Sequence, residues 1–340
     1  MRQRVGIIGL VHDHVWGLLK QWESLADVEI VAVAEPNAGL FAKVALPQST
    51  PRFYHSWKEL LQKEPLDLVQ ITNENNAARS VVEAAAARGI PIMLEKPLAS
   101  TLADGLSMYR MAEGARIPLF VNWFTFWQPT IQTALRMAKG DDIGRLHYVR
   151  FRIAHAGPRE IGCAPEFYEW LYDEEKNGGG AYMDFCGYGA YMATWLLGAP
   201  DRVQALAGRW VKNDIAVDDN GLLCLQYEKA VGLCEGSWTE AGATRFEGPT
   251  IHGDKGSILV VDGKVLLYRR GASQPQVVPV NPSPAGERSA PEYFSRLVRE
   301  GGTPTGIYDP AIALTVQRIL EAGREAVRSG CSTALPTAVR

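Results

Sequence analysis

The feature that most constrains the fold of this chain is a regular alternation of strand and helix patterns over its first 121 residues. Short apolar runs predict strands at residues 4–9, 28–34, 66–71, 91–94 and 117–121. Apolar side chains at helical spacing predict helices at residues 14–25, 77–88 and 101–114. Strands that alternate with helices are joined in parallel by right-handed crossovers, so this part predicts a doubly wound parallel sheet.

Beyond residue 121 the sequence changes to the two-residue period of β-strands. An aromatic-rich stretch at residues 122–129 and a helix at 130–139 come first. Strands are then predicted at residues 146–154, 202–211, 221–227, 231–239, 250–252, 258–261 and 265–268, with helices at 181–197 and 309–329. Hairpin signals between several strands predict a large, mostly antiparallel open sheet. We therefore expect an α/β protein with two domains, residues 1–121 and 122–340.

The composition limits the partners of the chain. Its 340 residues carry 35 Lys and Arg against 38 Asp and Glu, without a basic stripe, which argues against nucleic acid or a membrane surface as a partner. No apolar segment reaches the ~18 residues of a membrane span, and the N-terminus runs into a strand without a signal peptide. The five cysteines are scattered and form no Cys-x-x-Cys pair, so we expect a cytoplasmic protein.

The first strand–turn–helix has the architecture of a dinucleotide-binding site. Gly9 ends the first strand, and Glu35 lies at the tip of the next, where a carboxylate can accept hydrogen bonds from the adenosine ribose hydroxyls. That carboxylate would repel a 2′-phosphate and no arginine follows it, so NAD is favoured over NADP. The motif Gly-x-Gly-x-x-Gly is otherwise incomplete, because Val11 and His14 stand at its second and third glycines.

His12, Asp13 and His14 raise the question of a metal site. Alternate residues chelate only on extended backbone, and no further Cys or carboxylate lies nearby in the sequence, whereas such sites need three or four ligands. We therefore expect no metal here. Asp13 is expected to cap the following helix, and the two imidazoles to line or cover the turn that holds the cofactor pyrophosphate.

A second group of polar residues follows the strand at residues 91–94. Glu95, Lys96 and Pro97 come directly after apolar side chains, and a lysine there is costly to bury without a partner or a task. The carboxyl ends of parallel strands are where ligands bind, so this tip is a candidate site. The alternative is a surface turn with an ion pair.

A third group opens the helix predicted at residues 181–197. Three glycines, residues 178–180, let the backbone approach a ligand or another element closely. Asp184 and Tyr188 are four residues apart and share one face of a helix. Beside Lys96, Tyr188 would be a workable acid–base group, because a neighbouring ammonium lowers the pKa of a phenol. The alternative is a helix turn with a capping carboxylate and a tyrosine in the core.

The glycine turn, Glu95-Lys96-Pro97, the three glycines and Asp184-x-x-x-Tyr188, in this order, resemble the Gfo/Idh/MocA oxidoreductases over essentially the whole chain. The resemblance implies an NAD-binding Rossmann domain and a C-terminal substrate-binding domain whose open sheet mediates homodimers or homotetramers. It also implies a cis bond before Pro97. Tyr188 matches the tyrosine of the aldose and diol dehydrogenase branch, where inositol dehydrogenases have a histidine.

The resemblance implies hydride transfer between the nicotinamide and a secondary alcohol of a sugar, sugar derivative or cyclitol. Tyr188, assisted by Lys96, would take the hydroxyl proton, and Asp184 would bind substrate hydroxyls or orient the catalytic group. Cofactor contacts are expected at Gly9, Val11, His12, His14, Glu35, Thr72, Asn73, Asn75, Glu95 and Lys96. Candidate substrate contacts are Lys96, Trp123, His155, Tyr168, Asp184 and Tyr188.

Two other functions stay open at this point. One is a glycosidase or lyase that oxidises a sugar transiently, eliminates, and reduces it again without net redox change. The other is a non-catalytic protein that senses a sugar or NAD, motivated by Val11 and His14 in the incomplete motif. The first would bind NAD tightly and release no net NADH, whereas the second would turn nothing over.

Overall fold

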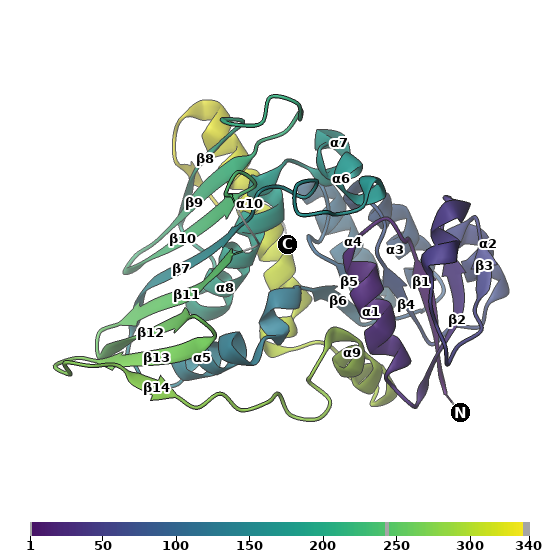
Figure 1. The fold of residues 1–340 in the computed structure, drawn as a ribbon, viewed down its shortest axis with the longest axis horizontal. Coiled ribbons are helices and arrows are strands. Elements are labelled where there is room, and N and C mark those ends of the chain that lie inside the picture. The colour runs from purple at the N-terminus through teal and green to yellow at the C-terminus, as the bar shows by residue number, and fades with distance from the viewer. Residues whose placement is uncertain (1, 242–244, 336–340) are drawn as a thin grey trace.

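The computed structural model describes residues 2–241 and 245–335 and contains two sheets, one in each half of the chain (Figure 1). Helices cover both faces of the N-terminal sheet, whereas those of the C-terminal half lie between their own sheet and the first domain (Figure 1). The structure therefore confirms the predicted α/β class with a parallel sheet and a second, larger sheet.

The N-terminal sheet has six parallel strands in the order β3-β2-β1-β4-β5-β6. Their bounds are β1 Gln3–Ile8, β2 Val28–Ala34, β3 Arg52–Tyr54, β4 Leu68–Ile71, β5 Ile92–Glu95 and β6 Leu119–Asn122. Most of their side chains are buried on both faces, as expected for a parallel sheet between helices. The chain order reverses between β1 and β4, and the crevice at such a switch point is where this fold binds ligands.

The helices of this half are α1 His14–Glu23, α2 Trp57–Lys63, α3 Ala78–Ala86 and α4 Leu102–Ala115, with short turns η1 Ala38–Lys43 and η2 Asn75–Ala77. The predicted strands and helices all occur, within a few residues of their expected ends. The sequence reading left out β3 and α2, because β3 has only three residues and two of its side chains are exposed.

The second sheet has nine strands in the order β14-β13-β12-β11-β7-β10-β9-β8-β15. Their bounds are β7 Leu146–Ala154, β8 Arg202–Gly208, β9 Asn220–Tyr227, β10 Ala230–Ser237, β11 Arg245–Gly253, β12 Gly256–Val261, β13 Lys264–Arg269, β14 Gln276–Val278 and β15 Thr333–Ala334. Strands β7 and β10 pair in parallel, and the other neighbouring pairs are antiparallel. The predicted large, mostly antiparallel sheet is therefore confirmed.

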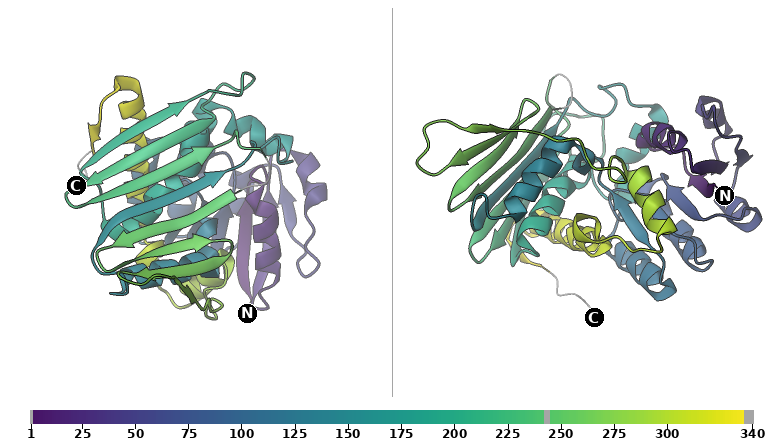
Figure 2. Two further views of the ribbon diagram at one scale, coloured as in Figure 1. Left: turned by 60° about the vertical axis from the view of Figure 1, so that its left-hand side comes forward. Right: turned by 90° about the horizontal axis from the view of Figure 1, so that it is seen from below.

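Three helices cover the inner face of this sheet: α5 Pro129–Lys139, α8 Gly187–Leu197 and α10 Pro310–Ser329. Figure 2 shows its outer face without a covering helix in the described chain. The short elements η3 Phe124–Trp127, α6 Pro165–Leu171, α7 Glu174–Asn177, η4 Tyr182–Cys186 and η5 Gly306–Tyr308 connect the rest. The single helix predicted at 181–197 is in fact a π-helical turn, η4, followed by α8.

Helix α9, Ala290–Arg299, belongs to the second half of the sequence but packs against the first domain, beside α1. Phe294 is fully buried there, with its ring 5.8 Å from that of Phe120 in β6. The sequence reading missed this helix. The sequence does contain a capping signal, since Ser289 and Glu292 have the spacing of a capping box. In the structure, the Ser289 side chain accepts a hydrogen bond from the backbone N–H of Glu292 at 3.3 Å.

Candidate active site

The three predicted polar groups meet at the carboxyl edge of the parallel sheet. The turn after β1 and the end of β5 supply one side of a cavity there, and α6 and η4 of the second half supply part of the other. Lys96 follows β5 directly, and its bond to Pro97 is cis, as the resemblance implied. The strand ends thus bring together side chains that lie far apart in the sequence.

Lys96 and Asp184 form a buried ion pair across the two halves of the chain. The Lys96 ammonium contacts Oδ1 of Asp184, and the two side chains are only 6% and 9% exposed. Trp238 donates from Nε1 to the other carboxylate oxygen of Asp184 at 3.3 Å. Removing either charge would leave the other buried without its partner, so the pair fixes the geometry of the site.

Tyr188 lies next to this pair but is not hydrogen-bonded to it. The Lys96 ammonium lies 5.2 Å from the centroid of the tyrosine ring, against its face. Tyr188 is 1% exposed, and its hydroxyl has no hydrogen-bond partner among the described residues. Burial, with the nearby Glu95 and Asp184 carboxylates, raises the pKa of the phenol well above its usual value. The expected lowering of this pKa by Lys96 is therefore wrong.

A cavity of about 290 Å³ lies in front of these groups. Both apolar and polar side chains line it: Asp13, His14, Lys96, Phe124, Ile153, His155, Pro158, Ile161, Cys163, Phe167, Leu171, Asp184, Phe185 and Tyr188. A small pocket with few polar groups that converge suits a single-ring ligand. Four of the predicted substrate contacts, Lys96, His155, Asp184 and Tyr188, line this cavity.

Two predicted substrate contacts do not line this cavity. Trp123 is 3% exposed and packs behind Tyr188, with ring centroids 5.0 Å apart. Tyr168 on α6 turns to Tyr172 instead, at 5.8 Å between rings. The helical period explains the position of Tyr168, because its neighbour Phe167 and the residue one turn later, Leu171, are the α6 residues that line the cavity.

His155, at the end of β7, is held in one neutral form. Its Nδ1 accepts a hydrogen bond from the backbone N–H of Gly157 at 2.9 Å. Burial lowers the pKa of this imidazole, outweighing the opposite effect of Asp184. With Nδ1 accepting, the proton of the neutral ring resides on Nε2, so His155 is suited to donate a hydrogen bond.

The glycine turn that would face the pyrophosphate packs on the tip of β4. Gly9 has φ +91°, and a Cβ there would lie 2.5 Å from the backbone nitrogen of Asn73. The Thr72 hydroxyl donates to the carbonyl of Gly9 at 2.7 Å, whereas Oδ1 of Asn73 is buried without a partner among the described residues. That unpaired oxygen is a place for a donor from a bound molecule, so the residues here fit a dinucleotide.

Glu35 stands at the tip of β2, where the adenosine ribose of a dinucleotide is expected. It is 3% exposed, and its oxygens accept hydrogen bonds from the backbone N–H groups of Leu10 at 2.7 Å and Asn37 at 2.9 Å. Burial raises the pKa of this carboxyl despite the two bonds. Each oxygen keeps a lone pair for a ribose hydroxyl, so Glu35 also fits the cofactor.

His12 and His14 are drawn into a buried polar network at the start of α1. Nδ1 of His14 lies 2.9 Å from Oε1 of Glu95, and Asn122 donates to the other Glu95 oxygen at 2.9 Å. The His12 ring lies 4.4 Å from that of His14 and is packed by α6. Asp13 does not cap the helix as expected, because its carboxylate accepts from the backbone N–H of Ala164 at 3.0 Å.

Two further predictions concern the contact between the domains. Asn75 donates to Oδ1 of Asn177 at 2.9 Å, so its amide joins the domains instead of being free for a cofactor. A Cβ at Gly178 or Gly180 would collide with a backbone oxygen, of Ser100 or Asp218 respectively. Gly178 and Gly180 therefore serve close packing of the chain on itself. Val11 is half-buried, and its carbonyl lies 3.5 Å from Nε1 of Trp170.

The sequence reading missed several residues that hold the site in place. Trp238 binds Asp184, Asn122 binds Glu95, and Asn177 joins α7 to Asn75. A signal existed only for Asn122, which ends a buried strand next to the Glu95 strand. Trp238 follows β10 and Asn177 ends α7, and no local pattern predicts the partner of either side chain.

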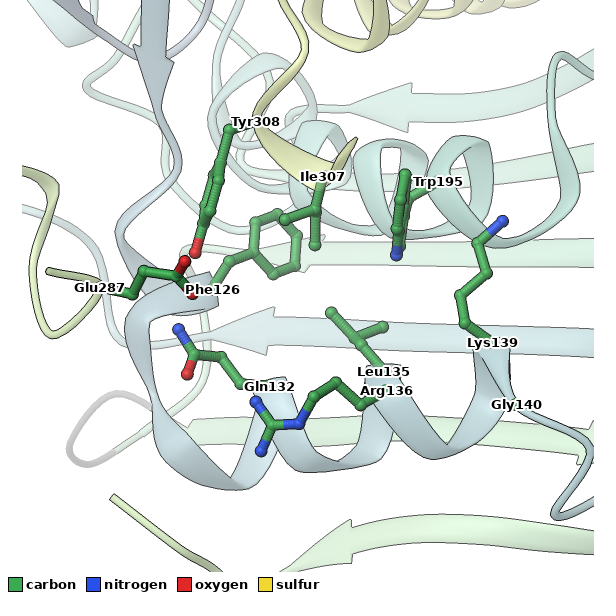
Figure 3. A pocket seen from close by; sticks show the side chains of 10 residues that line it. All are labelled: Phe126, Gln132, Leu135, Arg136, Lys139, Gly140, Trp195, Glu287, Ile307 and Tyr308. Carbon is green, nitrogen blue, oxygen red and sulfur yellow. The ribbon is translucent and has the colours of Figure 1, made fainter. Parts of the chain in front are cut away.

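A second cavity, of about 450 Å³, lies away from these residues, between α5, α8 and η5 (Figure 3). Its lining residues are Phe126, Gln132, Leu135, Arg136, Lys139, Gly140, Trp195, Glu287, Ile307 and Tyr308. The Lys139 ammonium lies 4.6 Å from the centroid of a Trp195 ring. Since none of the predicted site residues lines this cavity, the candidate active site is the smaller one.

No helix in the described part of the chain is long and apolar enough to cross a membrane.

D-Xylose 1-dehydrogenase (NADP(+)) 2 of Haloferax volcanii is 26% identical to this chain over 338 residues, which are 97% of this chain and 99% of that enzyme. D-Apiose dehydrogenase of Paraburkholderia graminis is 33% identical, but only over 126 residues, 37% of this chain and 34% of that enzyme.

The fold is also that of solved oxidoreductases. A levoglucosan dehydrogenase in complex with NADH and levoglucosan superimposes with a TM-score of 0.83 at 21% identity, covering 99% of this chain and 100% of that one. The family model described as an oxidoreductase family with an NAD-binding Rossmann fold matches residues 3–123. The model of the GFO/IDH/MocA C-terminal domain matches residues 131–259. The chain is a homologue of NAD(P)-dependent sugar dehydrogenases and belongs to the Gfo/Idh/MocA oxidoreductase family.

Proposed function

We propose that this protein transfers a hydride between NAD and a secondary alcohol of a sugar, sugar derivative or cyclitol. The observation that carries the proposal is that the Lys96–Asp184 ion pair and Tyr188 line one cavity at the carboxyl edge of the Rossmann sheet, and that the buried Tyr188 hydroxyl has no hydrogen-bond partner among the described residues. A buried hydroxyl without a partner is costly, and a substrate oxygen would satisfy it. The sugar substrates of the relatives support the substrate class.

The cofactor would be held by residues at the ends of β1, β2 and β4. Glu35 would bind the adenosine ribose, the turn after Gly9 would lie at the pyrophosphate, and Asn73 would accept a hydrogen bond. When bound, the nicotinamide supplies the hydride acceptor or donor. A carboxylate at the tip of β2 repels a 2′-phosphate, so we propose NAD as the preferred form, although the Haloferax volcanii relative is named for NADP(+).

The acid–base work falls to three side chains of this protein. Because burial keeps the Tyr188 phenol protonated at neutral pH, it suits the donation of a proton to a carbonyl oxygen in the direction of reduction. In the direction of oxidation, the reverse step applies: the hydroxyl proton would pass to the phenolate oxygen of an ionised Tyr188, a form that the Lys96 ammonium beside the ring would stabilise. His155, neutral and able to donate from Nε2, would orient a substrate oxygen.

The cavity excludes water from this chemistry. Phe124, Phe167 and Phe185 line it, so the acid–base groups act in an apolar environment. Electrostatic interactions are stronger in such surroundings than in water, which favours transition-state charge at the fixed polar groups.

The test is a substrate screen on protein purified without added cofactor. Co-purifying NAD(H) is measured first, and absorbance at the NADH band is then followed with NAD⁺ or NADP⁺ and a panel of sugars and polyols. The proposal expects net NADH formation with at least one single-ring substrate. Tightly bound NAD with substrate cleavage but no net NADH would identify transient oxidation instead, and ligand binding without turnover would identify a sensor.

We further propose that copies of the chain associate as a dimer or tetramer through the outer face of the nine-stranded sheet, which no described helix covers (Figure 2). Analytical ultracentrifugation should then show a species larger than the monomer. A monomer at micromolar concentration would contradict this. The five cysteines carry free thiols, in keeping with the proposed cytoplasmic location.

A further inference from the structure

We propose that His12, His14 and Glu95 form a binding site for a divalent transition-metal ion of the Zn²⁺ class. One ligand atom from each residue lies within 4.8 Å of the other two. Two imidazoles and one carboxylate are the ligand set of many open zinc sites, in which a fourth position stays free. The inference goes beyond the proposed function and does not depend on it.

The separations require only a small adjustment. Nδ1 of His14 already lies 2.9 Å from Oε1 of Glu95. Zinc bonds of 2.0–2.2 Å in a tetrahedral arrangement keep ligand atoms roughly 3.3 Å apart. The widest separation, up to 4.8 Å, would therefore close by about 1.5 Å when an ion binds. The ion would take the place of the proton that His14 and Glu95 share.

The surroundings hold the ligands in place. Glu95 is fixed through its second oxygen by Asn122 at 2.9 Å, and Asn122 in turn accepts from Nε1 of Trp127 at 2.9 Å. The His12 ring is buried between His14 and Phe167, with centroids 4.4 and 4.6 Å away. Outer contacts of this kind orient ligands in protein metal sites.

The position of the cluster supports an ion with an open coordination position. His14 lines the substrate cavity together with Lys96 and Asp184, so a bound ion has one side toward that cavity. His14 also stands where the dinucleotide motif has its third glycine, so the residue that replaces this glycine is one of the three proposed metal ligands. Imidazole ligands favour Zn²⁺, Co²⁺ or Ni²⁺ over Mg²⁺ and Ca²⁺, which prefer oxygen.

The test uses the full chain without a histidine tag, stripped with a chelator and titrated with Co²⁺. We expect one Co²⁺ per chain, with visible ligand-field absorption that Zn²⁺ abolishes by displacement. His14→Asn and Glu95→Gln should each weaken Co²⁺ binding by more than about 100-fold, because changes in outer contacts alone cost 10–100-fold. The matched control is His147→Asn, since the rings of His147 and His252 form another histidine pair, with centroids 6.3 Å apart. This variant should bind Co²⁺ like the wild type.

Wild-type Co²⁺ affinity in both His14→Asn and Glu95→Gln, or loss of binding in His147→Asn, would overturn the proposal. Thermal unfolding of the metal-free variants shows whether they fold. If His14→Asn or Glu95→Gln does not fold, His12→Asn is tested in its place. NADH binding to the metal-free wild type is measured separately by fluorescence. A protein that binds NADH but no Co²⁺ contradicts the metal site alone, and one that binds Co²⁺ but no NADH contradicts the proposed function alone.

Discussion

The catalytic and the cofactor halves of the crevice are built differently. In the catalytic half, Lys96 of the first domain meets Asp184 of the second in a buried pair, and no described residue bonds to the Tyr188 hydroxyl. In the cofactor half, Glu35 and the Gly9 carbonyl already accept hydrogen bonds within the chain, and the acceptors left for a ligand are the second lone pairs of Glu35 and Oδ1 of Asn73. The comparison teaches that the catalytic half is preorganised for a substrate oxygen, whereas a dinucleotide has to share or replace internal hydrogen bonds.

The largest effect should come from breaking the pair that joins the domains. Asp184→Asn leaves the Lys96 ammonium buried without its counter-charge, so the free energy of unfolding should fall by about 3–5 kcal/mol. Urea unfolding measures this loss. Glu59→Gln is the control, because its pair with Lys63 is about half exposed and should be worth less than about 1 kcal/mol. Equal losses in the two variants would show that the Lys96 pair is not special.

The next effect separates catalysis from stability within the catalytic half. Tyr188→Phe should lower kcat/KM by about 10²–10⁴. It should change the free energy of unfolding by less than about 1 kcal/mol, because the hydroxyl has no hydrogen-bond partner to lose among the described residues. Tyr191→Phe, one turn further along α8, is the control with the opposite expectation, since the Tyr191 hydroxyl donates to the carbonyl of Ile307. Retained activity in Tyr188→Phe would remove Tyr188 from the reaction.

A smaller effect tests the cofactor half. Glu35→Gln keeps the shape of the side chain but removes the charge that opposes a 2′-phosphate, so the ratio of kcat/KM for NAD⁺ over NADP⁺ should fall by about 10-fold, or 1.4 kcal/mol. Steady-state kinetics with both cofactors measures the ratio. An unchanged ratio would mean that selectivity lies elsewhere in the adenosine site.

The smallest effect is on the pH dependence of stability. Burial lowers the pKa of His155 below 6.5, so the unfolded chain binds more protons than the folded one as the pH falls below that value. The wild type should therefore lose stability between about pH 6.5 and the folded pKa, by up to about 1.4 kcal/mol per pH unit from this residue. His155→Asn, whose amide oxygen can accept from Gly157, should lose less. Urea unfolding of both proteins at pH 7.5 and 5.5 measures the loss. An equal decrease in the free energy of unfolding in the wild type and in His155→Asn would contradict the assignment of the loss to His155.

The sequence predicts the sheets better than it predicts the contacts between them. Periodicity of buried side chains gives β2 and β7 with their observed bounds, because each strand has a strong local pattern. Helix α9 has its own local signal, the capping residue Ser289, but nothing in that signal places the helix against the first domain, which lies far away in the sequence. Apolar repeats of 2 and 3.6 residues show which face of a strand or helix is buried, but they do not show which other element that face packs against.

The same limit applies to the site. Lys96, Asp184 and Tyr188 were predicted as a group, because a charge at a strand end and an Asp-x-x-x-Tyr spacing are local features. The prediction that Tyr188 has a lowered pKa was wrong, since burial depends on the packed environment. Nor could the sequence bring Glu95 to His14, and that proximity is what turns a histidine pair into a candidate metal site.

The central claim is that Lys96 and Tyr188 act as parts of one acid–base group. A double-mutant cycle on the substrate found in the screen tests it most directly, with kcat/KM measured for Lys96→Met, Tyr188→Phe and the double variant. The account predicts strongly non-additive losses, so that the double variant is within about 10-fold of the more damaged single variant, as for residues that act as a unit. Losses that multiply, or a single variant with wild-type kcat/KM, would contradict it.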